Sequence, residues 1–215
     1  MSKKQALTEF HRGSILAAAE RLFAEKGTEK TTMDDIAKEA EYSKATLYVY
    51  FQSKEEIIGA ILLSGMVLLS KKLRDAIQRQ EDWFQTYDAV CSTIIRFYEE
   101  NPSTYQAAAG QLAVLSVTGE DDGDGSELLR VTREINSELL EFLKQGVDTG
   151  VVQIAQPLEE VILLFWASLS GMVKTAERAE RYIRRTFELD RSGFLRDGTR
   201  LLLAAITGGK TAGQL

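Results

Sequence analysis

The spacing of apolar residues predicts that the chain begins with an amphipathic helix between about Thr8 and Glu25. Apolar residues there recur at the i, i+3, i+4, i+7 and i+8 offsets of a helix face: Ile15, Ala18, Ala19, Leu22 and Phe23. Gly27 follows, and glycine readily adopts the left-handed conformation that ends many helices. The pattern therefore predicts one long helix closed by a glycine.

Two short helices are predicted next, joined by a turn of about four residues at 40–43. Thr32 and Asp35 have the spacing of a capping box, although Asp is a shorter partner than the usual Glu or Gln. Ser43 is a good N-cap for the second short helix, in which Leu47 and Phe51 are apolar. Two short helices joined by such a turn and buttressed by a longer one form a helix-turn-helix.

A longer helix is predicted from Ser53 to about Ile77, because Ser53 and Glu56 form a second capping box ahead of an apolar run. Further helices are expected at 83–100, 103–117, 126–148, 157–186 and 191–207, and an acidic loop at 119–125. No segment alternates as a β-strand would. We therefore expect an all-α fold with a helix-turn-helix domain at 1–53 and a helical domain at 54–215.

Composition narrows the class of protein. The 215 residues include 44% hydrophobic and 27% charged residues, as in an ordinary globular protein, and only two prolines and one cysteine. One cysteine excludes an intramolecular disulfide. No signal peptide is evident, and the apolar runs at 57–69 and 161–173 are too short to span a bilayer, so a cytoplasmic protein without a membrane partner is expected.

Charge is the main objection to nucleic-acid binding. The net charge is −6, whereas proteins that bind nucleic acid broadly are basic. Residues 1–60 contain nine Lys or Arg and ten Asp or Glu, a net of −1. Any DNA contact must therefore use few cations together with helix N-termini, and a shallow salt dependence is expected.

The second short helix of a helix-turn-helix lies in the major groove, and its residue types here suit that role. Ser43, Lys44 and Thr46 can donate to base edges, and Ala45 permits close approach. Tyr48 and Tyr50 carry hydroxyls that can bond phosphates. One recognition helix reads half of a palindromic site, so this interpretation requires a dimer.

The stretch from 15 to 57 resembles the N-terminal domain of the TetR family of bacterial regulators. The matching marks include Phe23, Gly27, Thr32, the Thr46-Leu47-Tyr48 triplet and Lys54, all in register. The resemblance implies a homodimeric transcriptional regulator, most commonly a repressor, with a small-molecule effector bound in its C-terminal domain. It also implies that Lys44, Ala45 and Thr46 read bases. The residues that it implies for contacts with the DNA phosphate backbone are Thr32, Tyr48, Tyr50 and Lys54.

Two positions depart from the family pattern. The turn carries Glu41 where glycine is common, so a non-glycine residue is expected to take a strained backbone conformation there. Tyr50 stands where histidine is common, which keeps a hydrogen-bond donor. Neither change removes the motif.

The C-terminal domain shows no comparably specific motif. We expect an apolar or aromatic effector site, with candidate wall residues Trp83, Tyr87, Phe97, Tyr105, Leu112, Leu139, Phe142 and Leu143. The resemblance to the TetR family implies that the last two long helices form the dimer interface. The candidates there are Phe165, Trp166, Ser170, Gly171, Leu201, Leu202 and Ala205.

Several isolated residues invite more specific interpretations. His11, the only histidine, is expected to be a solvated side chain, with a phosphate contact as the alternative. Cys91 is expected to be a small core residue, since nothing basic adjoins it to make it a redox switch. The acidic loop has Val131 at the twelfth position of an EF-hand register, where a bidentate ligand is required, so calcium binding is not expected.

Two other functions compete with DNA binding. An enzyme would have to build its catalytic group around one histidine and one distant cysteine, without a phosphate loop, so neither catalysis nor a cofactor nor a metal site is expected. A protein-docking adaptor is compatible with the neutral N-terminal domain. Its docking face would carry Leu, Met or Phe anchors, whereas this face is polar.

Overall fold

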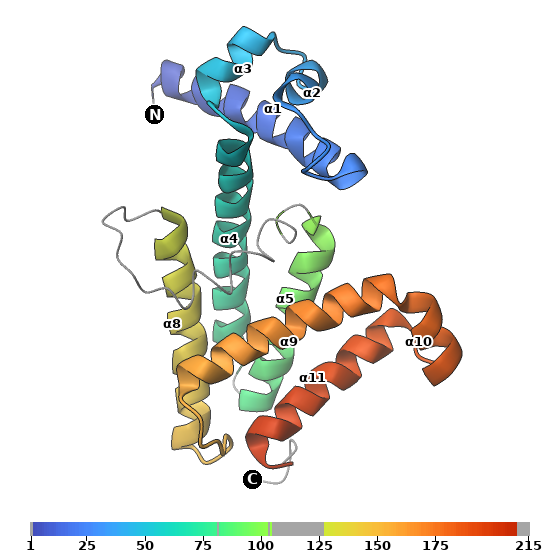
Figure 1. The fold of residues 1–215 in the computed structure, drawn as a ribbon. Helices are drawn as coiled ribbons and strands as arrows, with labels where there is room; N and C mark the ends of the chain where they lie inside the picture. Colours follow the sequence, from blue (N-terminus) through green and yellow to red (C-terminus); the bar gives the residue numbers. More distant parts are fainter. Residues whose placement is uncertain (1, 81, 103, 105–126, 210–215) are drawn as a thin grey trace. The chain divides into compact units, whose positions relative to one another are not determined.

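The computed structural model describes residues 2–80, 82–102, 104 and 127–209, and all of its regular secondary structure in these residues is α-helical (Figure 1). The chain divides after Met66 into two compact units, and residues 101, 102 and 104 belong to the first. The all-α prediction is confirmed. The domain boundary expected at residues 53 and 54 stays a prediction.

The first unit contains α1 (Lys3–Lys26), α2 (Met33–Glu39), α3 (Lys44–Tyr50) and the start of α4 (Lys54–Gln78). Helices α1, α2 and α3 thus form where the apolar pattern predicts them. Helix α1 starts five residues earlier than predicted, because Ser2 and Gln5 form a reciprocal capping box. Gly27 ends α1 with φ of 83°.

The core of the first unit is a single apolar cluster to which all four helices contribute side chains. Its buried members are Ile15, Ala19, Phe23, Ile36, Ala37, Leu47, Phe51, Ile57 and Ile61. Leu47 is the one fully buried residue of α3. Burying such a side chain stabilises the fold by about 2 kcal/mol, so Leu47 fixes which face of α3 points outward.

The second unit contains the rest of α4, α5 (Trp83–Glu100), α8 (Glu127–Asp148), α9 (Leu158–Arg178), α10 (Glu180–Phe187) and α11 (Arg191–Thr207). Helix α9 is central, because it packs against α5, α8, α10 and α11. The helices predicted at 83–100, 126–148 and 191–207 are confirmed to within one residue.

The single helix predicted at 157–186 is wrong, because the structure breaks it at Ala179 into α9 and α10. Ala179 has φ of −110° and ψ of 16°, outside the helical range, and its N–H still bonds to the Thr175 carbonyl. The break allows α10 to pack against both α9 and α11 and buries Ile183. Alanine favours helices, so tertiary packing overrides the local preference here.

Other predictions concern the membrane and the segment before α8. In the part of the chain that the structure describes, no helix has the length and apolarity to cross a membrane. Most of the helix predicted at 103–117, and the whole loop at 119–125, lie outside the described residues.

Candidate nucleic-acid interface and ligand cavity

The turn between α2 and α3 sets the angle at which α3 is presented. Glu41 N donates to Lys38 O and Tyr42 N donates to Ala37 O, at 3.1 and 2.8 Å, the paired bonds of a Schellman motif. The motif places Glu41 at φ of 59°, in the left-handed region. The strained backbone expected at this non-glycine residue is confirmed.

Helix α3 is capped at its start and exposes both polar and small apolar side chains. The Ser43 hydroxyl accepts from Thr46 N at 3.0 Å and shares a 2.7 Å hydrogen bond with the Thr46 hydroxyl. Leu47 is buried, and the exposed residues of the helix are Lys44, Ala45, Tyr48 and Val49. This face combines donors with small and apolar groups, the types that contact base edges and thymine methyls.

Val49 is a member of this face that sequence analysis passed over. Its side chain is 75% exposed, more than the 37% of Tyr48. Helical spacing from Ala45 could have found it, since i and i+4 share a face.

Lys44 is neutralised by an acidic residue of α2. Its ammonium lies 2.7 Å from the Asp34 carboxylate. The hydrogen bond that Lys44 donates to Asp34, followed by the charge of Asp34, raises the pKa of Lys44. Lys44 therefore meets a ligand as half of an ion pair, which limits its attraction for phosphate.

Thr32 occupies the N-cap of α2, as predicted from the capping box. Its hydroxyl accepts from Asp35 N at 3.2 Å, and its own N–H donates to the Asp35 carboxylate at 2.9 Å. The hydrogen bond from Lys26, reinforced by the Thr32 bonds, lowers the pKa of Asp35. Thr32 is exposed, at the positive end of α2 where phosphate is favoured.

The ammonium of Lys54 is held inside the first unit. Lys54 donates to the carbonyls of Thr28 and Thr31 at 2.9 and 3.1 Å. It thereby ties the start of α4 to the connection between α1 and α2, and one of its three donors remains for phosphate.

Tyr50 and His11 lie together rather than separately in solvent. Tyr50 is half-buried and its ring centroid is 5.4 Å from that of His11. His11 is itself half-buried, and its Nδ1 lies 2.6 Å from the Tyr42 hydroxyl. The expectation of a solvated His11 is wrong, because α1 begins at Lys3 and places this residue against the other helices.

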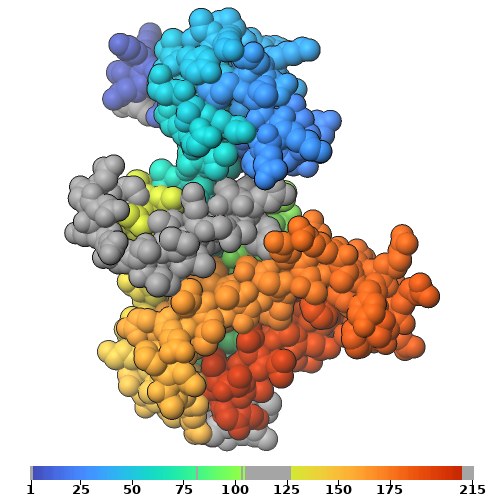
Figure 2. Space-filling model, in the orientation of Figure 1, coloured from blue at the N-terminus to red at the C-terminus, as the bar shows by residue number. Residues whose placement is uncertain are grey.

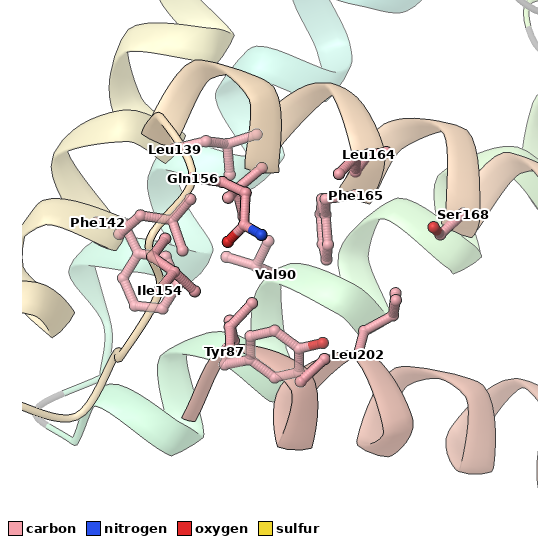
Figure 3. A pocket seen from close by; sticks show the side chains of 14 residues that line it. Tyr87, Val90, Leu139, Phe142, Ile154, Gln156, Leu164, Phe165, Ser168 and Leu202 are labelled. Carbon is pink, nitrogen blue, oxygen red and sulfur yellow. The ribbon is translucent and has the colours of Figure 1, made fainter. Parts of the chain in front are cut away.

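The second unit contains an apolar cavity of about 360 Å³ (Figure 3). It is lined by α5, α8, α9, α11 and the connection before α9, through Tyr87, Val90, Leu139, Phe142, Leu143, Ile154, Gln156, Val161, Leu164, Phe165, Ser168, Leu202, Ala205 and Ile206. None of these side chains is charged. Volume and lining are those of a small-molecule site.

Four of the eight candidate wall residues line this cavity: Tyr87, Leu139, Phe142 and Leu143. Phe97 is buried elsewhere, since ten residues along α5 carry it about 15 Å beyond Tyr87. Tyr105 and Leu112 lie outside the described residues.

Trp83 supports the cavity wall from behind. Its ring stacks on Phe142, with centroids 4.8 Å apart and an angle of 13°, and on Tyr87 at 6.0 Å. Its indole N–H donates to the Phe142 carbonyl at 3.1 Å. Gly146 makes this possible, because a Cβ there would lie 2.7 Å from the indole nitrogen.

Three polar groups belong to the cavity lining. The Tyr87 hydroxyl donates to the Thr199 carbonyl of α11 at 2.8 Å, and burial raises the pKa of this phenol. Gln156 and Ser168 lie toward different parts of the cavity in Figure 3, the Gln156 amide facing inward. The described lining thus offers an amide and a hydroxyl to a polar group of a ligand.

Comparison with known proteins agrees with this architecture. Residues 15–61 match the family described as bacterial regulatory proteins, tetR family. The chain is 28% identical over 167 residues to the uncharacterized HTH-type transcriptional regulator YfiR of Bacillus subtilis, covering 75% of this chain and 78% of YfiR. The chain is a TetR family transcriptional regulator.

Two solved structures share the fold of this TetR family regulator. The ketosteroid transcriptional regulator KstR2 of Mycobacterium tuberculosis superposes with a TM-score of 0.65, at 20% identity, over 91% of this chain and 94% of KstR2. A 66-residue segment is 38% identical to KstR2, there named a transcriptional repressor, covering 31% of this chain and 33% of KstR2. FadR of Bacillus subtilis, in complex with stearoyl-CoA, has a TM-score of 0.66 at 16% identity, over 92% and 98% of the chains.

Membership of the TetR family settles the class of activity. The protein is a DNA-binding transcriptional regulator and not an enzyme. The single cysteine, Cys91, is buried beside Tyr87 and Phe142, as expected for a core residue, and burial raises the pKa of its thiol to about 12.

The seven dimer-interface candidates of this regulator divide between the surface and the interior of the second unit. Gly171, Leu201 and Ala205 are exposed. Trp166 is only 7% exposed, since its indole N–H donates to the Asn136 side chain of α8 at 3.2 Å. The other three are half-buried, and two of them, Phe165 and Leu202, line the cavity; the third is Ser170.

Another exposed apolar residue of α9 was not among those candidates. Leu164 is 54% exposed and lines the cavity, whereas Leu201 of α11 is 73% exposed and does not belong to the lining. In Figure 2 these helices, coloured orange to red, form an open face of the second unit.

Proposed function

We propose that the protein is a homodimeric repressor that binds a palindromic operator through α3 and releases it when an apolar ligand enters the cavity of the second unit. The observation that carries the proposal is the uncharged cavity, because it lies among helices that include both candidate dimerisation helices. Such a protein acts where the chromosome is, so a cytoplasmic location is part of the proposal.

The DNA-binding part of the proposal rests on the exposed face of α3 and on its flanks. We assign base contacts to Ser43, Lys44, Ala45 and Thr46 and phosphate contacts to Thr32, Tyr48, Tyr50 and Lys54. A dimer is needed because a recognition helix covers half a site, and two half-sites lie about 34–36 Å apart along the DNA.

The dimer part of the proposal rests on exposed apolar surface. Leu164 and Leu201 are exposed large apolar residues of α9 and α11, which also carry the small exposed residues Gly171 and Ala205. Leu164 and Ala205 border the cavity as well. Small residues let helices of two protomers approach closely, and apolar ones gain free energy on burial. Two copies of this helix pair would form a four-helix interface.

The ligand part of the proposal follows from the cavity lining. An uncharged lining favours a hydrocarbon or aromatic body, because burying an unpaired charge there costs several kcal/mol. Gln156 and Ser168 suit one or two neutral polar groups, such as a carbonyl or hydroxyl. The names of KstR2 and of the FadR complex refer to a ketosteroid and to stearoyl-CoA, ligands with large apolar bodies.

Release requires that the ligand bind the DNA-free and DNA-bound forms with different affinity. Because Phe165, Leu202 and Ala205 belong to the candidate dimerisation helices and also line the cavity, an occupant that spreads α9 from α11 changes the interface. The separation of the two recognition helices changes with it, and operator affinity falls.

The test combines ligand screening with a cavity-filling variant. Saturated acyl chains, their CoA thioesters and a steroid are titrated against the protein on its operator, with release followed by fluorescence anisotropy. Val161→Phe places extra volume in the cavity, and the control Val147→Phe makes the same change at a 42% exposed position on α8.

Only the cavity variant is expected to change the response to the ligand. Val161→Phe is expected to bind operator normally and to need at least about tenfold more ligand for release, whereas Val147→Phe is expected to behave as wild type. A ligand that releases Val161→Phe as readily as wild type places its site elsewhere and contradicts the proposal. Tighter operator binding in the presence of the ligand identifies an activator or a co-repressor mechanism instead.

A further inference from the structure

Two consecutive side chains of α1 reach across to the recognition helix. His11 Nδ1 lies 2.6 Å from the Tyr42 hydroxyl, and the Arg12 guanidinium donates to the Tyr50 carbonyl at 2.6 Å. Both residues are half-buried. They bring α1 into polar contact with segments 31 and 38 residues further along the chain.

Arg12 secures the C-terminal end of α3. Carbonyls in the last turn of a helix lack hydrogen-bond donors within the helix. Arg12 supplies a donor to the Tyr50 carbonyl. Its guanidinium lies 4.0 Å from the centre of the Phe51 ring, and Glu56 Oε1 lies 3.9 Å from its Nη1. Arg12 is thus held by three groups at the junction of α3 and α4.

His11 contacts both ends of α3 with one imidazole. Tyr42 directly precedes the N-cap Ser43, and Tyr50 is the last residue of α3. The imidazole bonds the hydroxyl of the first and lies against the ring of the second, with centroid distances of 5.5 and 5.4 Å. Movement of α3 relative to α1 therefore breaks at least one of the two contacts.

We propose that His11 is a positioning residue for DNA binding. The inference rests on the assignment of α3 as the recognition helix. His11 holds the two ends of α3 at fixed places on α1, so that the exposed face of α3 meets the groove already oriented. Such pre-organisation raises affinity by reducing the ordering that binding requires.

The test measures operator and non-specific DNA affinity for wild type, His11→Gln and His11→Ala, with folding followed by circular dichroism. His11→Gln keeps a side chain that can bond to the Tyr42 hydroxyl, so it is expected to match wild type within about twofold.

His11→Ala is expected to bind operator at least about fivefold more weakly and to lose less non-specific affinity. Equal operator affinity of folded His11→Ala and wild type overturns the positioning role, and so does an equal loss of operator and non-specific affinity. Wild type that binds no operator refutes DNA recognition by α3 itself, a result distinct from both.

Discussion

The salt dependence of operator binding can be worked out from the cations of the first unit. Residues 1–60 contain nine Lys or Arg. Five of these side chains are engaged by carboxylates or carbonyls: Arg12, Arg21, Lys26, Lys44 and Lys54. Among the described residues no such partner holds the other four, Lys3, Lys4, Lys30 and Lys38.

These four, together with Lys54, whose partners are uncharged carbonyls, set an upper limit of five cations per protomer on counterion release. Each phosphate that a protein neutralises contributes about −0.9 to the slope of log affinity against log salt concentration. Ten cations in a dimer therefore limit the slope to about −9, which corresponds to a loss of about 10⁵-fold between 50 and 200 mM salt. A measured slope steeper than about −10 refutes this reasoning.

Asp34→Asn tests the same reasoning at one residue. The substitution frees Lys44 from its carboxylate partner 2.7 Å away. Operator affinity is expected to rise severalfold at 50 mM salt, and the slope is expected to steepen by about 0.9 per protomer. Fluorescence anisotropy at four or five salt concentrations measures both quantities.

Asp75→Asn is the matched control, because Asp75 pairs with Arg79 in the second unit and its loss changes net charge equally. An equal response to both substitutions shows a general charge effect. Unchanged binding by Asp34→Asn shows that Lys44 does not contact DNA.

Three further predictions concern stability and reactivity. Gly146→Ala is expected to destabilise the protein by about 2 kcal/mol in urea unfolding, because the added methyl overpacks against Trp83. Gly59 has open space around it, so Gly59→Ala is expected to stabilise the protein by about 0.5–1 kcal/mol. A Gly146→Ala variant that is more stable than Gly59→Ala contradicts the packing described. Glu41→Gly is expected to raise stability by about 1 kcal/mol by relieving the left-handed strain, so a loss of stability argues against that strain. Native Cys91 is expected to resist a maleimide at pH 8 and to react after unfolding, since burial raises its pKa to about 12; rapid labelling of native protein contradicts its burial.

The sequence predicted the helix-turn-helix well because its signals are local. Thr32, Ser43 and Leu47 each act within one or two turns of helix, through caps or burial, and the structure has each in that place. The strained turn at Glu41 is predicted by the resemblance, because glycine is common at this position in the TetR family.

Long-range contacts could not be predicted in this way. His11 and Tyr42 are 31 residues apart, and no periodicity relates them. Lys54 looked like a free cation, yet two carbonyls more than twenty residues earlier hold it. The cavity likewise draws Gln156 from a connection that carries no pattern.

Tertiary packing also decided the course of the C-terminal helices. The apolar spacing through 157–186 gives no sign of the break at Ala179, which serves contacts with α11. Trp166 was expected at a dimer surface, since its place on an apolar helix does not show which neighbour covers it. Its bond to Asn136 directs it toward α8 instead.

The most direct test of the account is a binding titration against the DNA immediately upstream of the protein's own coding region. Wild type is compared with Thr46→Ala/Tyr48→Ala and with the control Tyr182→Ala/Thr186→Ala, which removes the same residue types from exposed positions on α10. The account predicts salt-dependent specific binding by wild type and the control, lost in the α3 variant. Specific binding that survives in the folded α3 variant contradicts it.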